Sequence, residues 1–151
     1  MRAYLSDYQY DQEVSPEKLA FMTDWMLRWH HRNKEFSFSL VLIDFQDPNA
    51  LGNALGAAYA MNLIRRVSRE VTDVLRNTDM FCRTRVSSFY VLLPQGAPSI
   101  VLNKIEPILT AARVDGLEAS HLQIGKLSIP EDLSGETAAA ELFDRLRAGR
   151  G

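Results

Sequence analysis

The alternation of apolar and polar positions along the chain predicts a series of helices and strands. A first helix is expected to begin at Ser15-Pro16-Glu17, because a serine cap, a proline at the first helical position and an early acid favour a helix start. Leu19, Met22, Met26 and Trp29 then recur at helical spacing. We interpret this stripe as a packing face rather than a ligand site.

The next segment, Phe36–Phe45, begins with alternation and ends as an apolar run, which predicts a strand buried on both faces. Asp44 interrupts this run near its end, where a carboxylate either serves chemistry or prepares the following turn. From Ala50 to Arg76, apolar residues recur every four positions and predict one long helix.

Two short strands, Met80–Thr84 and Phe89–Leu93, are expected to form a hairpin around the turn Arg85-Val86-Ser87-Ser88. The later elements are a helix that Pro107 should kink or restart, and a strand in which Gly125 indicates a bulge or a close backbone approach. Their expected ranges, with that of the last helix, are Ile100–Arg113, His121–Ile129 and Thr137–Arg147.

This order of elements predicts an α+β sandwich, with a mixed, mainly antiparallel central sheet flanked by helices. We expect one domain over residues 15–151, preceded by a polar lead-in segment at residues 1–14. Both ends resemble cut points, so we expect the sequence to be part of a longer protein.

The amino-acid composition and charge exclude some classes of function. The chain has 151 residues, 46% hydrophobic and 24% charged, with a net charge of -2, so a core can form and a broad basic surface for nucleic acid is not expected. No apolar run approaches the length of a membrane span, and no secretion signal is evident. Cys82 is the only cysteine, which excludes an internal disulfide. We therefore expect a cytoplasmic segment without membrane contact, although the full-length protein can be attached to a membrane elsewhere.

Three stretches of the sequence resemble the GGDEF domain, the bacterial diguanylate cyclase fold with a βαββαβ core. Leu40–Phe45 is similar to the first strand of that family, which ends in a metal-binding Asp, here Asp44. Phe81–Pro94 is similar to the signature hairpin, with Arg85-Val86-Ser87-Ser88-Phe89 at the Gly-Gly-Asp/Glu-Glu-Phe motif. Gln123-Ile124-Gly125-Lys126 is similar to the later Ser-Ile-Gly-Val strand. The family's final strand would lie beyond Gly149-Arg150.

The departures from the family pattern imply a catalytically inactive domain. A cyclase holds magnesium on a triphosphate with two carboxylates, and the resemblance places neutral Ser87 at the second position. Arg85-Val86 replaces the glycine pair that lets substrate approach the backbone. The guanine-reading positions of the family fall at about Gly52 and Met61, whose side chains cannot accept from guanine. We therefore expect no catalytic residue, no bound metal and no cofactor.

One family feature is retained. Active members carry an Arg-x-x-Asp inhibitory site that binds cyclic di-GMP just before the hairpin, and Arg76-Asn77-Thr78-Asp79 has that pattern at the matching place. Arg can pair with guanine O6 and N7 or with phosphate, while a carboxylate can accept from guanine N1–H and N2–H. We expect the side chains of Arg76 and Asp79 to be exposed, and Arg83 and Arg85 on the hairpin are candidates to complete the site. The alternative is a capped helix end with a surface ion pair worth at most about 1 kcal/mol.

We therefore predict a cyclic di-GMP receptor that passes its signal to a protein partner or acts as a homodimer. Such domains resemble the receptor parts of exopolysaccharide-secretion and biofilm regulators, of which the Pel polysaccharide receptor is the type. Two alternatives stay open: an interaction or dimerisation module of the same fold with no nucleotide, and a residual cyclase or GTP-binding regulator that uses Asp44.

Overall fold

The computed structural model describes residues 13–45, 48–85, 87–95, 103–114 and 122–149. A four-stranded sheet forms its centre, with the spatial order β2-β3-β1-β4 and antiparallel pairing between all neighbours. The chain order of strands and crossovers is the expected βαββαβ, so the predicted fold class is confirmed. The strands are β1 (Phe38–Phe45), β2 (Met80–Arg85), β3 (Ser88–Pro94) and β4 (Leu122–Ile129).

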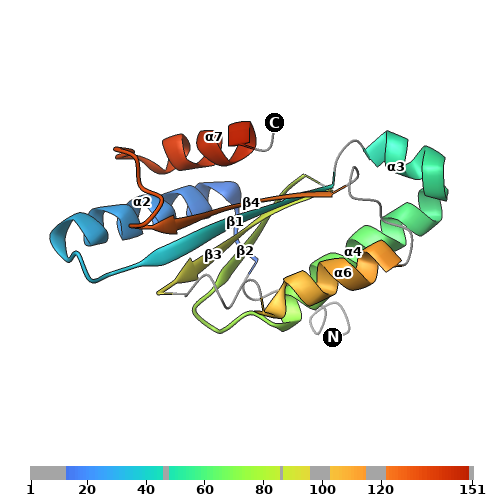
Figure 1. The fold of residues 1–151 in the computed structure, drawn as a ribbon, viewed down its shortest axis with the longest axis horizontal. Helices are drawn as coiled ribbons and strands as arrows, with labels where there is room; N and C mark the ends of the chain where they lie inside the picture. The colour runs from blue at the N-terminus through green and yellow to red at the C-terminus, as the bar shows by residue number, and fades with distance from the viewer. Residues whose placement is uncertain (1–12, 46–47, 86, 96–102, 115–121, 150–151) are drawn as a thin grey trace.

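Helices cover both faces of the sheet (Figure 1). Among the described helices, the first and last in the chain, α2 and α7, lie together on one face, while α4 and α6 lie on the other and α3 packs beside α4. Their ranges are α2 (Pro16–Arg32), α3 (Pro48–Leu55), α4 (Ala57–Asp73), α6 (Glu106–Val114) and α7 (Ala139–Gly149).

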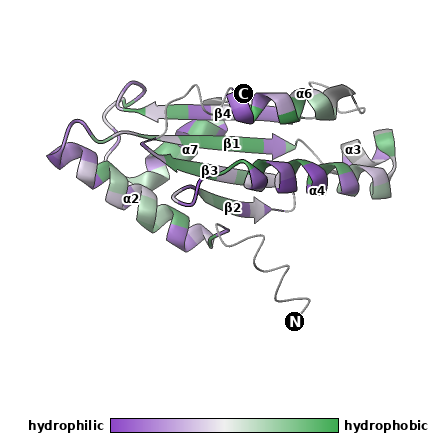
Figure 2. Cartoon of the chain, turned by 90° about the horizontal axis from the view of Figure 1, so that it is seen from below, coloured by the Kyte–Doolittle hydropathy of each residue, from purple (hydrophilic) through white to green (hydrophobic). Residues whose placement is uncertain are grey.

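The sheet separates two hydrophobic cores. Alternate residues of β1 serve both of them, because Val41 and Ile43 pack toward α4 and α6 whereas Leu40 and Leu42 pack toward α2 and α7. All four side chains are at most 1% exposed, so the prediction that this strand is buried on both faces is confirmed. In Figure 2 hydrophobic colour predominates along β1 and β3, whereas the helices carry both hydrophobic and hydrophilic residues.

The expected start of the first helix is confirmed. Ser15 has extended backbone angles and its side chain accepts from the Lys18 N–H at 3.1 Å, with Pro16 at the first helical position. The packing stripe is only partly right: Leu19 and Met26 are buried, but Trp29 is 40% exposed. The buried face includes Leu27 instead, since the true stripe is rotated around the helix from the expected one.

The single long helix expected from Ala50 to Arg76 is wrong. The chain forms two helices that break at Gly56, whose φ of 90° lies in the left-handed region that glycine enters without steric cost. The second helix, α4, ends at Asp73, which leaves Arg76 in the connection to β2. That shorter helix frees the Arg-x-x-Asp segment to form a turn.

The hairpin is tighter than expected, because Arg85 and Ser88 belong to the strands and pair with each other. Val86 lies outside the described residues, as do Ile100 to Leu102 and His121 at the starts of two later expected elements. Pro107 lies in the first turn of α6, which confirms that it marks a helix start.

Candidate functional site

The connection between α4 and β2 holds Arg76 and Asp79 in direct contact. The Asp79 N–H donates to the Arg76 carbonyl at 3.0 Å, which closes a turn of four residues. The Asp79 carboxylate accepts from the Arg76 backbone N–H at 2.7 Å, from Arg76 Nη2 at 2.7 Å and from Nε at 3.1 Å. Nη2 also donates to the Pro94 carbonyl at 2.8 Å, which ties the turn to the end of β3.

Burial makes the two side chains unequal. The Asp79 side chain is 2% exposed, whereas Arg76 keeps 37% of its side-chain surface accessible. The hydrogen bond to Asp79 raises the pKa of Arg76 above its ordinary value, although partial burial opposes this shift. The expectation that both side chains are exposed is therefore wrong for Asp79, because the turn folds its carboxylate inward onto the arginine.

A cleft opens beside this corner, between the Arg76–Asp79 turn and the first helix. Its volume is about 740 Å³, within the usual size range of small-molecule sites. One wall is formed by Asn77, Thr78 and Asp79, and the opposite wall by side chains of α2. The α2 side chains in that wall are Lys18, Met22, Trp25 and Met26.

Arg83 lies on the other face of the sheet from the cleft. Its guanidinium is 5.7 Å from the Phe81 ring centroid, and it contacts Ser68 of α4 at 3.3 Å and Glu13 at 4.0 Å. These contacts direct Arg83 toward α4, away from the Arg76–Asp79 corner.

Arg85 lies at the far end of β2, about 17 Å of extended strand from Met80. It lines a separate small cavity with Asp44, Tyr90 and Arg147. Arg147 donates to the Tyr90 hydroxyl at 3.0 Å and pairs with Asp144. Within one protomer, therefore, the structure brings neither Arg83 nor Arg85 to the corner.

The small cavity lies at the β2–β3 hairpin, whose sequence resembles the family signature. Asp44 lies at the end of β1 opposite Ser88, and the backbone carbonyl of the buried Ser87 accepts from the Phe45 N–H at 2.8 Å. Ser87 has no charge with which to join Asp44 as a metal ligand. Among the residues that the structure describes, no group of three or more His, Cys, Asp or Glu is placed to hold a metal ion.

The sequence interpretation missed the contribution of α2 to the cleft. It assigned Met22 and Met26 to packing and did not single out Lys18 or Trp25. The available signal in the sequence is that Trp25 lies one helical turn before Trp29, which places two large aromatic side chains near one another on the helix. Separately, none of the helices in the described part of the chain has the length and hydropathy that crossing a bilayer requires.

An antiparallel sheet in the order β2-β3-β1-β4, with helices on both faces and a turn before its hairpin, defines a nucleotidyl cyclase-like α+β domain. The chain belongs to the GGDEF family: the family described as "Diguanylate cyclase, GGDEF domain" matches residues 16–130. A comparison with curated protein sequences returns no significant match.

Solved structures of GGDEF domains share the fold at low sequence identity. The active GGEEF domain of a Vibrio cholerae diguanylate cyclase superposes with a TM-score of 0.68 at 13% identity, covering 91% of this chain and 88% of that one. The GGDEF domain of Caulobacter crescentus DgcB in complex with c-di-GMP superposes with a TM-score of 0.67 at 15% identity, covering 89% of this chain and 81% of that one. The GGDEF domain of Pseudomonas aeruginosa YfiN superposes with a TM-score of 0.65 at 20% identity, covering 89% of this chain and 86% of that one.

Proposed function

We propose that this chain is a catalytically inactive GGDEF domain that binds cyclic di-GMP through the corner formed by Arg76 and Asp79. Membership of the family supports a guanine nucleotide as the ligand, and a similar fold, that of DgcB, is described in complex with c-di-GMP. The Arg-x-x-Asp spacing occurs once in the sequence, at the turn where family members with the inhibitory site carry it.

The observation that carries the proposal is the fixed orientation of the Arg76 guanidinium. Asp79 and the Pro94 carbonyl hold it by hydrogen bonds of 2.7 and 2.8 Å, yet 37% of the side chain is accessible. An arginine held in this way loses little further freedom when it pairs with guanine or phosphate, which favours binding. Asp79, being buried, acts first as a positioning residue, and it reaches a guanine only if the ion pair opens.

Loss of catalysis is proposed from the signature hairpin. Asp44 stands alone as a carboxylate where the family uses two, with Ser87 at the other position. Arg85 adds a bulky cation to the cavity that would otherwise receive a magnesium-bound triphosphate.

A receptor transmits its signal when ligand binding changes its contacts with a partner protein. One related structure is that of the diguanylate cyclase SiaD in complex with its activator SiaC, so a similar fold is described with a protein bound. We propose that ligand binding at the corner alters contacts with a protein partner, of which exopolysaccharide or biofilm machinery is our first candidate.

Calorimetric titration with cyclic di-GMP tests the proposal. Arg76→Lys keeps a cation beside the buried Asp79 but removes the planar fork, so we expect affinity to fall about tenfold to hundredfold while the fold is retained. Asp79→Asn should weaken binding as well, because the amide cannot accept all the donors that orient Arg76.

The matched control is Arg69→Lys, the same exchange at an exposed arginine on α4 away from the corner. It should bind as the unaltered protein does. Absence of any binding heat and of any thermal shift with the unaltered protein at high micromolar ligand would refute the receptor function.

The interaction-module alternative has an observation of its own. Phe21 and Trp29 on α2 are 61% and 40% exposed, which is unusual for large hydrophobic side chains. If this face holds two protomers together without a nucleotide, Phe21→Ser should shift sedimentation toward monomer in ligand-free solution.

A further inference from the structure

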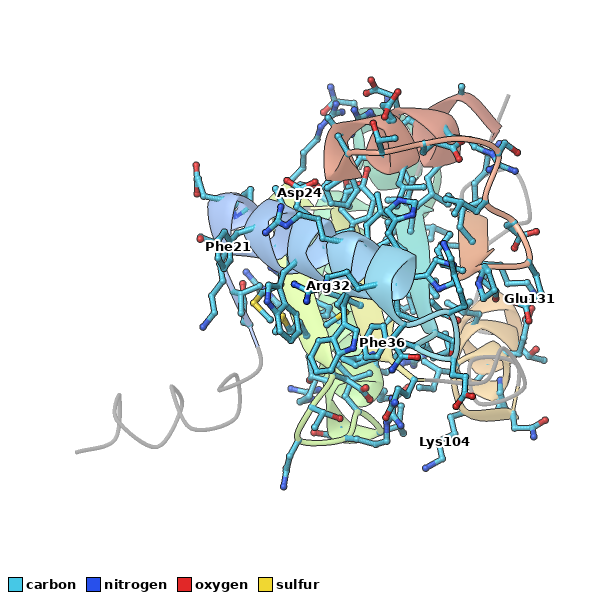
Figure 3. The ribbon with its side chains drawn as sticks, turned by 90° about the vertical axis from the view of Figure 1, so that its left-hand side faces the viewer. Phe21, Asp24, Arg32, Phe36, Lys104 and Glu131 are labelled. Carbon is cyan, nitrogen blue, oxygen red and sulfur yellow. The ribbon has the colours of Figure 1, made fainter. Side chains whose placement is uncertain are left out.

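The cleft beside the Arg76–Asp79 corner has a second wall that the Arg-x-x-Asp pattern does not include. That wall is the helix α2, which packs on β2 and β3 and contributes Lys18, Met22, Trp25 and Met26 to the lining of the cleft. In Figure 3 Phe36 lies next to α2 on the side of the sheet, whereas Phe21 projects from the helix away from the molecule. The cleft thus joins residues more than 50 positions apart in the sequence.

The side chains of the cleft combine apolar surface with a small number of polar groups. Met22, Trp25 and Phe36 provide apolar and aromatic surface, and Asn77 and Thr78 provide polar groups along the turn. Among the described lining residues the charged ones are Lys18 and Asp79, at opposite walls. A mainly apolar site with few, convergent polar groups is the usual composition of a small-molecule site.

Trp25 is held in place by a row of aromatic rings that begins on α2 and ends at Phe36, between α2 and β1. Its ring meets that of Trp29 edge to face, with centroids 4.6 Å apart at 90°, and Trp29 stacks on Phe36 at 4.9 Å and 13°. Trp25 is nevertheless 39% exposed. A braced, exposed indole at the border of a cleft is suited to stacking against a planar ring, because little side-chain freedom remains to be lost.

Cyclic di-GMP presents two guanine faces and two phosphates, so a site that binds it well needs stacking surface as well as hydrogen-bond donors. The corner supplies Arg76, whose bonding partners Asp79 and Pro94 line the cleft, and α2 supplies an aromatic face and the Lys18 ammonium. Protein aromatic side chains commonly recognise bases by stacking, and lysine recognises phosphate as a point charge.

We propose that α2 forms the second half of the nucleotide site, in which Trp25 stacks on a guanine and Lys18 pairs with a phosphate of cyclic di-GMP. This inference rests on the proposed function, and it names the residues that would complete the site within one protomer. It assigns to Trp25 and Lys18 the supporting role that the sequence interpretation gave to Arg83 and Arg85.

Binding measurements on matched pairs of variants test it. Trp25→Ala should weaken binding by about tenfold or more, and Lys18→Ala by severalfold with a reduced dependence on salt. The controls are Phe21→Ala, an exposed aromatic on the same helix outside the cleft, and Lys34→Ala, an exposed lysine just beyond the helix. Both should bind cyclic di-GMP as the unaltered protein does, and circular dichroism checks that every variant remains folded.

Fluorescence provides a direct readout, because the chain has two tryptophans and both lie on α2. In the Trp29→Phe variant Trp25 is the sole tryptophan and keeps an aromatic neighbour. Saturating cyclic di-GMP should quench or shift its emission, since the base would stack directly on the indole.

The outcomes separate this inference from the proposed function. In one outcome the unaltered protein binds cyclic di-GMP and Arg76→Lys weakens the binding, but the affinity of Trp25→Ala stays within about twofold and the emission of Trp25 is unchanged. In that case α2 is not part of the site, and only this inference falls. If the unaltered protein does not bind cyclic di-GMP at all, both fall.

Discussion

At the scale of single residues, burial decides what Asp79 and Cys82 can do. The Asp79 carboxylate is 2% exposed and is neutralised by the arginine three positions earlier, so it is a structural group before it is a ligand-binding one. Removing the arginine altogether would leave a buried carboxylate without its partner, which is why Arg76→Lys is a safer test than Arg76→Ala.

Cys82 yields a prediction about reactivity. Burial chiefly, and then Glu13 and Glu17, raise the pKa of its thiol to about 11 from an ordinary value of 9.0. At pH 8 the folded protein should therefore react with iodoacetamide about a hundredfold more slowly than the urea-unfolded chain, because the thiolate is the reactive form. Mass spectrometry of the alkylated protein measures both rates.

The same shift has a consequence for stability. Below pH 9.0 the thiol is protonated in both states, whereas between pH 9.0 and about 11 the unfolded chain loses its proton first. The stability of the fold should fall as pH rises through that window, and a Cys82→Ser variant should lack this part of the loss. In the alkylation experiment described above, equal rates for the folded and the unfolded protein would contradict the burial of Cys82.

The sequence predicts some residues well and others not at all. The spacing of Arg76 and Asp79 and the serine cap at Ser15 are local features, and the structure bears out their contacts. The bond from Arg76 to the Pro94 carbonyl joins positions 18 residues apart and depends on the registry of β3, which no local pattern reveals.

At the scale of elements, local patterns predicted which segments are helices and strands but not how they end. Gly56 lies within an otherwise helical pattern, and its positive φ, which separates α3 from α4, is a property of the folded chain. Trp29 was misplaced because several rotations of α2 satisfy the same spacing, and only packing against the sheet selects one.

Gly125 on β4 offers a test of how α7 packs. A Cβ at this position would lie 3.1 Å from Leu146 Cδ2 and 3.4 Å from the Leu146 carbonyl oxygen, so the close backbone approach expected from the sequence is confirmed. Gly125→Ala should destabilise the protein by about 1–3 kcal/mol in urea denaturation, through overpacking against α7.

The matched control for that substitution is Gly52→Ala in α3. The new Cβ would be 3.7 Å from the Ala57 Cα, an ordinary contact, and alanine favours helix over glycine by about 0.5–1 kcal/mol. Neutral or increased stability is therefore expected. A Gly125→Ala protein as stable as the original would mean that α7 moves aside without cost.

At the scale of the whole molecule, the GGDEF fold is shared with active cyclases, so activity depends on individual side chains. From the proposed loss of catalysis we expect no cyclic di-GMP from GTP and magnesium above the level without protein, because resemblance to the family places neutral Ser87 at the position of the second metal-binding carboxylate. Chromatography of the reaction measures the product, with the active Vibrio cholerae GGEEF domain as positive control. Product formation by this chain would support the residual-cyclase alternative instead.

The neighbouring positions of the first and last helices have a consequence for biosynthesis. The Ala139 N–H donates to Asp24 at 2.6 Å, and Leu142 and Leu146 complete the core over which Leu27 packs. A ribosome releases α2 more than 100 residues before α7, so this half of the interior stays uncovered until α7 has been synthesised. Chaperones would need to cover the exposed apolar surface of the nascent polypeptide over that interval. The core on the other face of the sheet, beneath α4 and α6, can assemble earlier.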